Sequence, residues 1–100
     1  MKNTVVKNSS VHGRGLFAFR KIFKGEIIEP IEGKIIFGDS KSRFSLKFSK
    51  GQSLILTNKT KWINHSNDPN VTFNLKRESV IALKDIDVGE EMFSRYNSVF

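Results

Sequence analysis

Residues 64–70 read Asn-His-Ser-Asn-Asp-Pro-Asn and directly follow the apolar pair Trp62-Ile63. Asn, Ser and Asp side chains bond readily to nearby backbone groups, and Pro69 excludes a helix through this segment. We therefore expect a rigid, irregular loop that is rich in donors and acceptors and is reached from a buried anchor. Loops of this kind commonly carry a binding site. The alternative for the same composition is a set of self-bonded turns with His65 bonded in the interior.

Most other apolar segments are short and are bounded by Gly, Ser, Asn or Lys. Phe44, Leu46 and Phe48 alternate with polar residues, a pattern typical of a half-buried strand. The strands predicted in this way are residues 26–31, 34–37, 43–48, 53–56 and 71–75. A hairpin turn is predicted at residues 50–52, and at most one turn of helix near residues 60–63. The fold class should therefore be mostly β, with little helix.

Two distant stretches of the chain repeat one short pattern. Ala-x3-Ile-x2-Gly-Glu occurs at residues 18–26 and again at residues 82–90, and each copy is preceded by an apolar pair. Each copy predicts a short strand, a turn closed by Gly, and a second strand. Two equivalent β-arches in one small domain indicate a pseudo-symmetric arrangement, although the match is too short to prove a duplication.

The composition of the 100 residues favours one intracellular domain without disulfide bonds or a bound metal. There is no Cys, and the two His residues lie far apart, so neither disulfides nor a metal site are expected. No apolar run approaches a membrane span, and no signal-peptide pattern is present. The net charge of +7 has two interpretations. It is either a solvated basic surface, or a surface that attracts nucleic acid or the proteins packaged with it.

Two further motifs are candidates for chemistry. Residues 12–18 read His-Gly-Arg-Gly-Leu-Phe-Ala, and the two glycines that bracket Arg14 allow positive φ and let a ligand approach the main chain closely. An ordinary turn is the simpler explanation of this motif on its own. Tyr96 is the only Tyr of the chain and follows the Gly-Glu-Glu of residues 89–91. By itself, such a residue is often a packing residue with a solvated hydroxyl.

In their order along the chain, these segments resemble the SET-domain protein lysine methyltransferases, and the minimal viral and bacterial members in particular. The resemblance rests on Gly-Arg-Gly-Leu-Phe-Ala at 13–18, Lys-Gly-Glu at 24–26, Trp-Ile-Asn-His-Ser at 62–66 with Pro-Asn at 69–70, and Gly-Glu-Glu at 89–91 with Tyr-Asn at 96–97. It implies a single minimal SET domain over residues 1–100, with the β-clip fold of short strands and small sheets and a C-terminal pseudoknot. Threaded segments are rare, so residue patterns alone would not predict this one.

The resemblance also implies transfer of a methyl group from S-adenosyl-L-methionine to a lysine ε-amine of a histone or another basic protein. Tyr96 would be the catalytic residue beside the transferring methyl group, and no metal is needed. The implied cofactor-binding residues are Gly13, Arg14, Gly15, Asn64 and His65.

The substrate lysine would enter through a narrow, apolar channel. The residues expected to line it are Phe48, Trp62, Ser94 and Phe100. Ser94 stands where many family members carry a second Tyr, which leaves the number of transferred methyl groups open. The chain ends four residues after Tyr96. Aromatic closure of the channel therefore requires Phe100 to fold back or a second subunit to contribute, so a homodimer is an open possibility.

Two other functions stay open. A SET-fold module that binds peptides but is catalytically weak or inactive would be consistent with Ser94 and the short C-terminus. A small β-domain that contacts nucleic acid through its basic face, with Phe stacking, would be consistent with the charge. The substrate protein does not follow from the sequence. Both the cytoplasm and the nucleus of a host cell fit the expected intracellular location.

Overall fold

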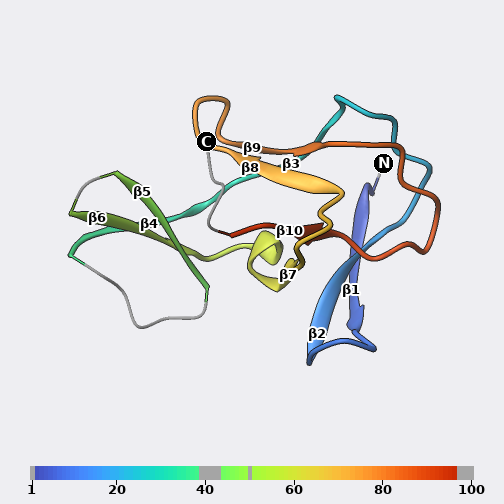
Figure 1. Cartoon of the computed structure of the whole chain (residues 1–100), viewed down its shortest axis with the longest axis horizontal. Helices are drawn as coiled ribbons and strands as arrows, with labels where there is room; N and C mark the ends of the chain where they lie inside the picture. The colour runs from blue at the N-terminus through green and yellow to red at the C-terminus, as the bar shows by residue number, and fades with distance from the viewer. Residues whose placement is uncertain (1, 39–43, 50, 97–100) are drawn as a thin grey trace.

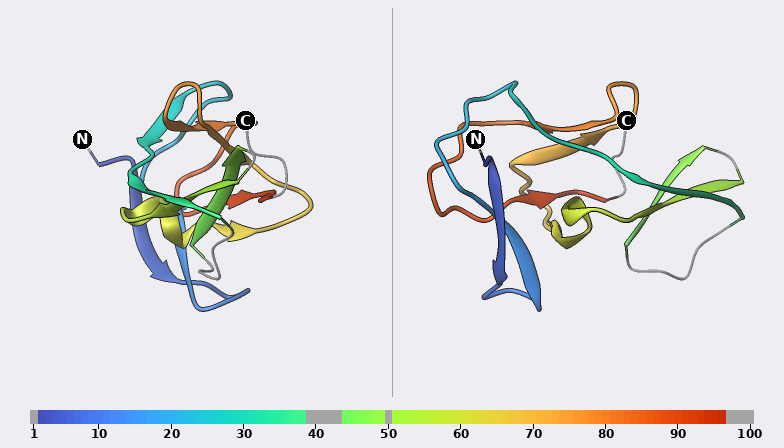
Figure 2. Two further views of the ribbon diagram at one scale, coloured as in Figure 1. Left: turned by 90° about the vertical axis from the view of Figure 1, so that its left-hand side faces the viewer. Right: turned by 180° about the vertical axis from the view of Figure 1, so that it is seen from behind.

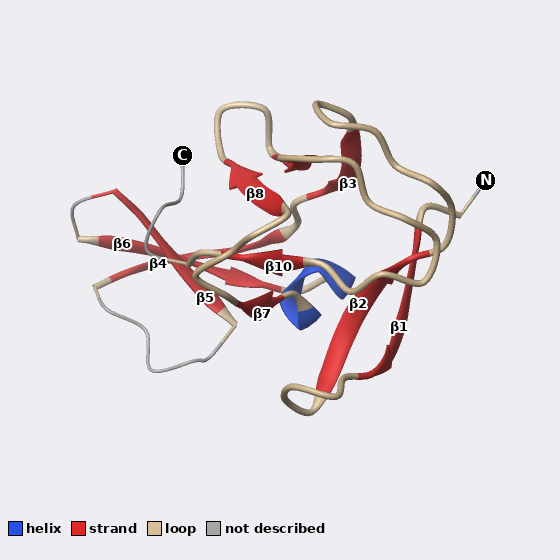
Figure 3. Cartoon of the chain, turned by 45° about the vertical axis from the view of Figure 1, so that its right-hand side comes forward, coloured by secondary structure: helices blue, strands red, loops and turns tan. Residues whose placement is uncertain are grey.

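The computed structural model describes residues 2–38, 44–49 and 51–96, without the side chains of residues 47–49. Within these residues the chain forms short strands and a single turn of 3-10 helix, η1, at Lys59–Trp62 (Figures 1 and 3). The strands are β1 Thr4–Asn8, β2 Arg14–Ala18, β3 Ile27–Pro30, β4 Gly33–Phe37, β5 Ser45–Ser49, β6 Gln52–Leu56, β7 Asn64–His65, β8 Val71–Asn74, β9 Ser79–Ala82 and β10 Phe93–Ser94.

The described strands pair into four small sheets. β1 and β2 form an antiparallel hairpin, β9 lies between β3 and β8, β6 lies between β4 and β5, and β7 pairs with β10 in parallel. The molecule measures 37 × 27 × 26 Å, with the β4–β6–β5 sheet towards one end, the β1–β2 hairpin towards the other and the β7–β10 pair between them (Figures 1 and 2). No helix of the described residues is long and apolar enough to cross a membrane.

The predicted strands are confirmed as β3, β4, β5, β6 and β8, with ends that differ from the predicted ones by at most two residues. The predicted turn of helix corresponds to η1, and the described part of the predicted hairpin turn joins β5 to β6. The sequence reasoning missed β1, where only Val5-Val6 is apolar. It also missed β7, which is too short to show any periodicity. β10 is the second strand that the repeat at residues 82–90 predicted.

The two repeated stretches form equivalent arches that clasp each other. Ile22 and Ile86 form an antiparallel bridge in which each amide donates to the other residue's carbonyl, at 2.9 and 2.8 Å. The amides of Gly25 and Gly89 each donate at 2.8 Å to the carbonyl of the alanine that begins the opposite arch. These glycines have φ of 89° and 83°, a region that other residues rarely adopt. The predicted pseudo-symmetry is therefore confirmed.

The hydrophobic core lies where the arches meet the β3–β9–β8 sheet. Its fully buried side chains include Leu16, Ile22, Phe73, Ile86 and Met92. These residues come from both ends of the chain, so the core fixes the N-terminal hairpin and the C-terminal segment relative to each other. The candidate site lies directly beside this junction.

Candidate active site

The C-terminal segment is bonded along both sides by the polar loop of residues 64–70. On one side β10 pairs with β7, and the amide of Ser66 donates to the carbonyl of Ser94 at 3.1 Å. On the other side, the amide of Asn70 donates to the carbonyl of Phe93, also at 3.1 Å. This crossing is the expected pseudoknot.

Asn70 fixes the crossing with its side chain, which is 5% exposed. Its Nδ2 donates to the carbonyl of Glu91 at 2.8 Å, and its Oδ1 accepts from the amide of Phe93 at 2.7 Å. A buried amide with both ends satisfied in this way specifies one arrangement of the two segments. Part of the polar loop therefore bonds within the protein, in agreement with the alternative of self-bonded turns. Asn64 and His65 lie beside a cavity.

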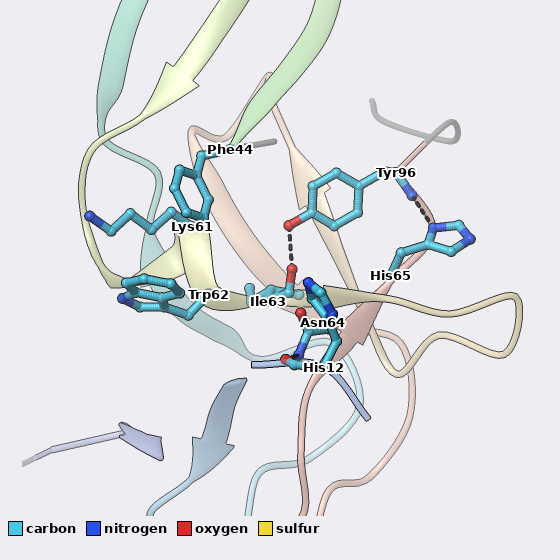
Figure 4. A pocket seen from close by; sticks show the side chains of 8 residues that line it. All are labelled: His12, Phe44, Lys61, Trp62, Ile63, Asn64, His65 and Tyr96. Atoms are coloured by element: carbon cyan, nitrogen blue, oxygen red, sulfur yellow. Dashed lines mark hydrogen bonds between the residues drawn. The ribbon is translucent and has the colours of Figure 1, made fainter. Parts of the chain in front are cut away.

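A cavity of about 200 Å³ opens beside the crossing (Figure 4). Its lining residues are His12, Phe44, Lys61, Trp62, Ile63, Asn64, His65 and Tyr96. They come from the β1–β2 loop, the start of the β5 region, the segment from η1 to β7, and the residues after β10. The cavity exists only because the crossing brings these distant segments together.

Tyr96 is held at three points. Its hydroxyl donates to the carbonyl of Ile63, and its amide donates to Nδ1 of His65 at 3.3 Å (Figure 4). Its ring packs edge-on against the fully buried Phe73, with the ring centroids 5.6 Å apart. The phenol therefore has a fixed position in the cavity wall, beside the main chain of β7.

The side-chain amide of Asn64 joins the two ends of the site. Its Nδ2 lies 3.1 Å from the carbonyl oxygen of His12, 3.0 Å from that of Arg14 and 3.0 Å from Oε2 of Glu91. The turn around Gly13 and Gly15 and the polar loop, which the sequence analysis treated as separate motifs, are thus directly bonded.

The two glycines of the turn serve different purposes. Gly13 has φ of 51°, in the left-handed region. At Gly15, a Cβ atom would lie 2.4 Å from Oε2 of Glu91, so no side chain fits there while the carboxylate stays in place. The group that approaches the main chain closely at Gly15 is thus a carboxylate of the protein itself. The approach of a ligand to this turn stays a prediction.

Two cations lie over the aromatic wall of the cavity. The Trp62 ring has the Arg14 guanidinium 5.9 Å and the Lys61 ammonium 5.1 Å from its centroid, and Phe44 meets it edge-on at 5.3 Å. Neither cation forms an ion pair with a carboxylate of the described residues. The cavity rim is therefore positively charged and attracts anionic groups.

The structure brings most of the predicted site residues together. Trp62, Asn64, His65 and Tyr96 line the cavity, and the Gly-Arg-Gly turn is bonded to Asn64. Ser94 is 1% exposed and is not among the lining residues. The side chain of Phe48 and all of Phe100, which were expected in the channel, lie outside the described residues.

Sequence reasoning did not assign Phe44, Lys61 or Glu91 to the site, and it included His12 in the candidate segment 12–18 without giving it a role. Lys61 directly precedes a residue that was assigned, which was the only available signal. Phe44 was interpreted as part of an alternating strand. Glu91 was quoted only as part of a motif, and nothing in its neighbours indicated that its side chain reaches Asn64.

The family described as "SET domain" matches residues 13–97. This chain belongs to the SET-domain family. The match begins at the Gly-Arg-Gly turn and ends just after Tyr96, so it contains every lining residue of the cavity except His12. No curated protein matches the chain significantly.

Solved structures of other SET proteins share the fold. A candidate histone methyltransferase of Plasmodium falciparum is 22% identical, with a TM-score of 0.77 over 100% of this chain and 97% of that one. A chain of ctPRC2 in complex with H3K27me3 and H3K27M is 27% identical, with a TM-score of 0.76 over 95% of this chain. A chain of a humanized mutant of the Chaetomium thermophilum Polycomb Repressive Complex 2, bound to the inhibitor GSK126, is 26% identical, with a TM-score of 0.74 over 99% of this chain. This SET domain spans 14% and 15% of those two longer chains.

Proposed function

We propose that this SET domain is an S-adenosylmethionine-dependent protein-lysine N-methyltransferase. The observation that supports it most is the meeting of the Tyr96 hydroxyl, the Ile63 carbonyl, Asn64 and His65 around one cavity at the crossing. Membership of the SET family and the histone methyltransferases among the structural neighbours add support. The substrates would be lysines of histones or of other basic proteins.

The lining residues suit the proposed methyl donor. Asn64, His65 and the main chain of the Gly-Arg-Gly turn would hold its polar groups, while Trp62, with Phe44 packed against it, would form a wall of the lysine channel. The unpaired cations of the rim, Arg14 and Lys61, suit its carboxylate. When bound, S-adenosylmethionine supplies a methyl group that is activated by the sulfonium charge.

The protein's own contribution is to position and to deprotonate the lysine. Transfer to an amine is an in-line displacement, so holding the reacting atoms in line supplies much of the catalysis. Deprotonating a lysine with an ordinary pKa costs roughly 4 to 5 kcal/mol at pH 7. An apolar channel lowers that cost because burial disfavours the ammonium form. Tyr96 would orient the amine with its hydroxyl, and main-chain carbonyls such as that of Ile63 would face the methyl group.

The test is methyl transfer from labelled S-adenosylmethionine to core histones and to a lysate of basic proteins. Tyr96→Phe keeps the ring on Phe73 and removes the hydroxyl, so we expect transfer to fall about a hundredfold while donor binding persists. Asn67→Ala, an exposed position in the polar loop, is the matched control and should transfer normally. Fluorescence of Trp62, the only Trp of the chain, reports donor binding in each variant.

The outcomes separate this proposal from its main alternative. If the wild-type chain neither binds the donor nor modifies any lysine, the proposal fails. If it binds lysine-containing peptides in calorimetry but transfers no methyl group, a peptide-binding module replaces the enzyme as the best interpretation.

A further inference from the structure

The side chain of Glu91 joins parts of the site that are far apart in the sequence. Ser9 Oγ lies 2.9 and 3.0 Å from its two carboxylate oxygens, and Asn64 Nδ2 lies 3.0 Å from Oε2. The same oxygen lies against Gly15, where it leaves no room for a Cβ. Glu91 thus contacts the loop after β1, the Gly-Arg-Gly turn and β7 at once.

Both partners of Glu91 are hydrogen-bond donors: Asn64 to Oε2, and Ser9 to either oxygen. The hydroxyl oxygen of Ser9 accepts from the amides of Val11 at 3.0 Å and His12 at 3.3 Å, so its proton is the group left to bond Glu91. The Asn64 NH₂ group can only donate. An ionised carboxylate offers acceptors alone, whereas a glutamine would turn an NH₂ group towards one of these donors.

Through these bonds, Glu91 fixes the rim of the cavity. Ser9 also closes the loop that leads to the site, since its amide donates to the carbonyl of Gly13 at 2.7 Å. Asn64, held by Glu91, in turn binds the carbonyls of His12 and Arg14. Removing the carboxylate would therefore loosen both the Asn64 amide and the loop that carries His12.

We infer that Glu91 is a positioning residue for donor binding: it holds Asn64 and residues 9–15 in the arrangement that receives the donor, without touching the donor itself. This inference rests on the proposed function. The contacts of Tyr96 with Ile63, His65 and Phe73 do not involve Glu91, so we expect them to persist when Glu91 is changed. The effect should therefore fall on donor affinity and not on the rate of transfer at saturation.

Glu91→Gln is the test, with Glu90→Gln as the matched control. Both remove one negative charge at adjacent positions. Oε1 of Glu90 accepts from the amide of Asp87 at 3.1 Å, a bond that a glutamine keeps. We expect the Kd and the KM for S-adenosylmethionine to rise about tenfold in Glu91→Gln. The new NH₂ group would face the Ser9 hydroxyl or the Asn64 NH₂ group, and the hydrogen bond to that group would be lost. The kcat should stay within about twofold, and Glu90→Gln should match the wild type.

Ser9→Ala provides a second variant in case Glu91→Gln does not fold. It removes one bond to the carboxylate and should also weaken donor binding, and its effect should be small in a Glu91→Gln background because both changes act on one contact. Donor affinity unchanged in both single variants overturns the inference while leaving the proposed function intact. The inference also falls if kcat drops and the Kd for the donor does not change. A wild-type chain that binds no donor removes the proposed function and this inference together.

Discussion

The main chains of Ile22 and Ile86 are joined by two hydrogen bonds of 2.9 and 2.8 Å, and both side chains are fully buried. They occupy equivalent positions in the two arches. Further along the C-terminal segment, the amide of Met92 donates to the carbonyl of Leu16 at 2.8 Å. The main-chain bonds of Ile86 and Met92 together align the C-terminal segment with β2. This alignment places Glu91 against Gly15.

Truncating either isoleucine should destabilise the protein strongly. Ile22→Ala and Ile86→Ala each remove a fully buried side chain, so we expect the free energy of unfolding to fall by about 2 to 5 kcal/mol in each. Val88→Ala lies in the same arch as Ile86 but is 66% exposed, and it should change stability by less than about 0.5 kcal/mol. Urea unfolding measures the stability of all three variants. A similar small loss of stability in all of them would contradict the central role of the contact between Ile22 and Ile86.

Asn70 should contribute more to stability than its neighbour in the polar loop. Asn70→Ala leaves the carbonyl of Glu91 and the amide of Phe93 without their side-chain partner, so we expect a loss of about 2 kcal/mol or more. Asn67→Ala is exposed and should cost almost nothing. Urea unfolding and protection of the Phe93 amide in hydrogen exchange test this difference. Equal stability of the two variants would show that the crossing does not depend on this side chain.

Gly15→Ala should weaken donor binding by displacing Glu91. The added Cβ would lie 2.4 Å from Oε2 and 2.8 Å from Cδ of that residue, so the carboxylate must leave its partners. We expect a loss of donor affinity comparable to that of Glu91→Gln, read from Trp62 fluorescence. In a Glu91→Ala background the same change meets no carboxylate, so its own effect should largely disappear. Fully additive effects would show that Gly15 acts independently of Glu91.

The first arch should make stability depend on pH in the acid range. The hydrogen bond from Arg20 to Glu26, at 2.6 Å, lowers the pKa of that carboxyl below its ordinary value of 4.5, and the amide of Phe23 adds to the effect. Because the folded pKa is the lower one, the stabilisation is present above the unfolded pKa and is lost as the pH falls through the folded pKa.

Glu26→Gln should therefore melt below the wild type at pH 7, and the difference should shrink towards pH 3. Thermal melts at several pH values measure it, with Glu90→Gln as a control for the removal of one negative charge. A difference in melting temperature that stays constant from pH 7 to pH 3 would rule out the ionised pair as its cause.

Much of the fold followed from local patterns in the sequence. Alternation around Leu46 predicted β5, and the repeated Gly-Glu stretches predicted the two arches, because strands and glycine turns depend on neighbouring residues. The bridge between Ile22 and Ile86 and the crossing that Asn70 fixes both join residues far apart in the chain. No periodicity encodes such contacts, so the resemblance to a family was needed to expect the pseudoknot.

The candidate site was predictable to a similar degree. Asn64, His65 and Tyr96 were identified through the resemblance, and all three line one cavity. Glu91 was not assigned, because its importance comes from bonds to Ser9 and Asn64 that only the folded chain creates. Ser94 was expected in the channel from its place in the motif; it is 1% exposed and is not among the residues that line this cavity.

The order in which the site's segments occur along the chain has a consequence for biosynthesis. The cavity needs residues near position 12, near position 63 and at position 96, so a ribosome must release almost all of the described chain before any binding surface can form. Contacts of such long range also make folding slow, on a scale of milliseconds to seconds. A nascent chain would thus remain unable to engage a methyl donor until translation of this region is complete.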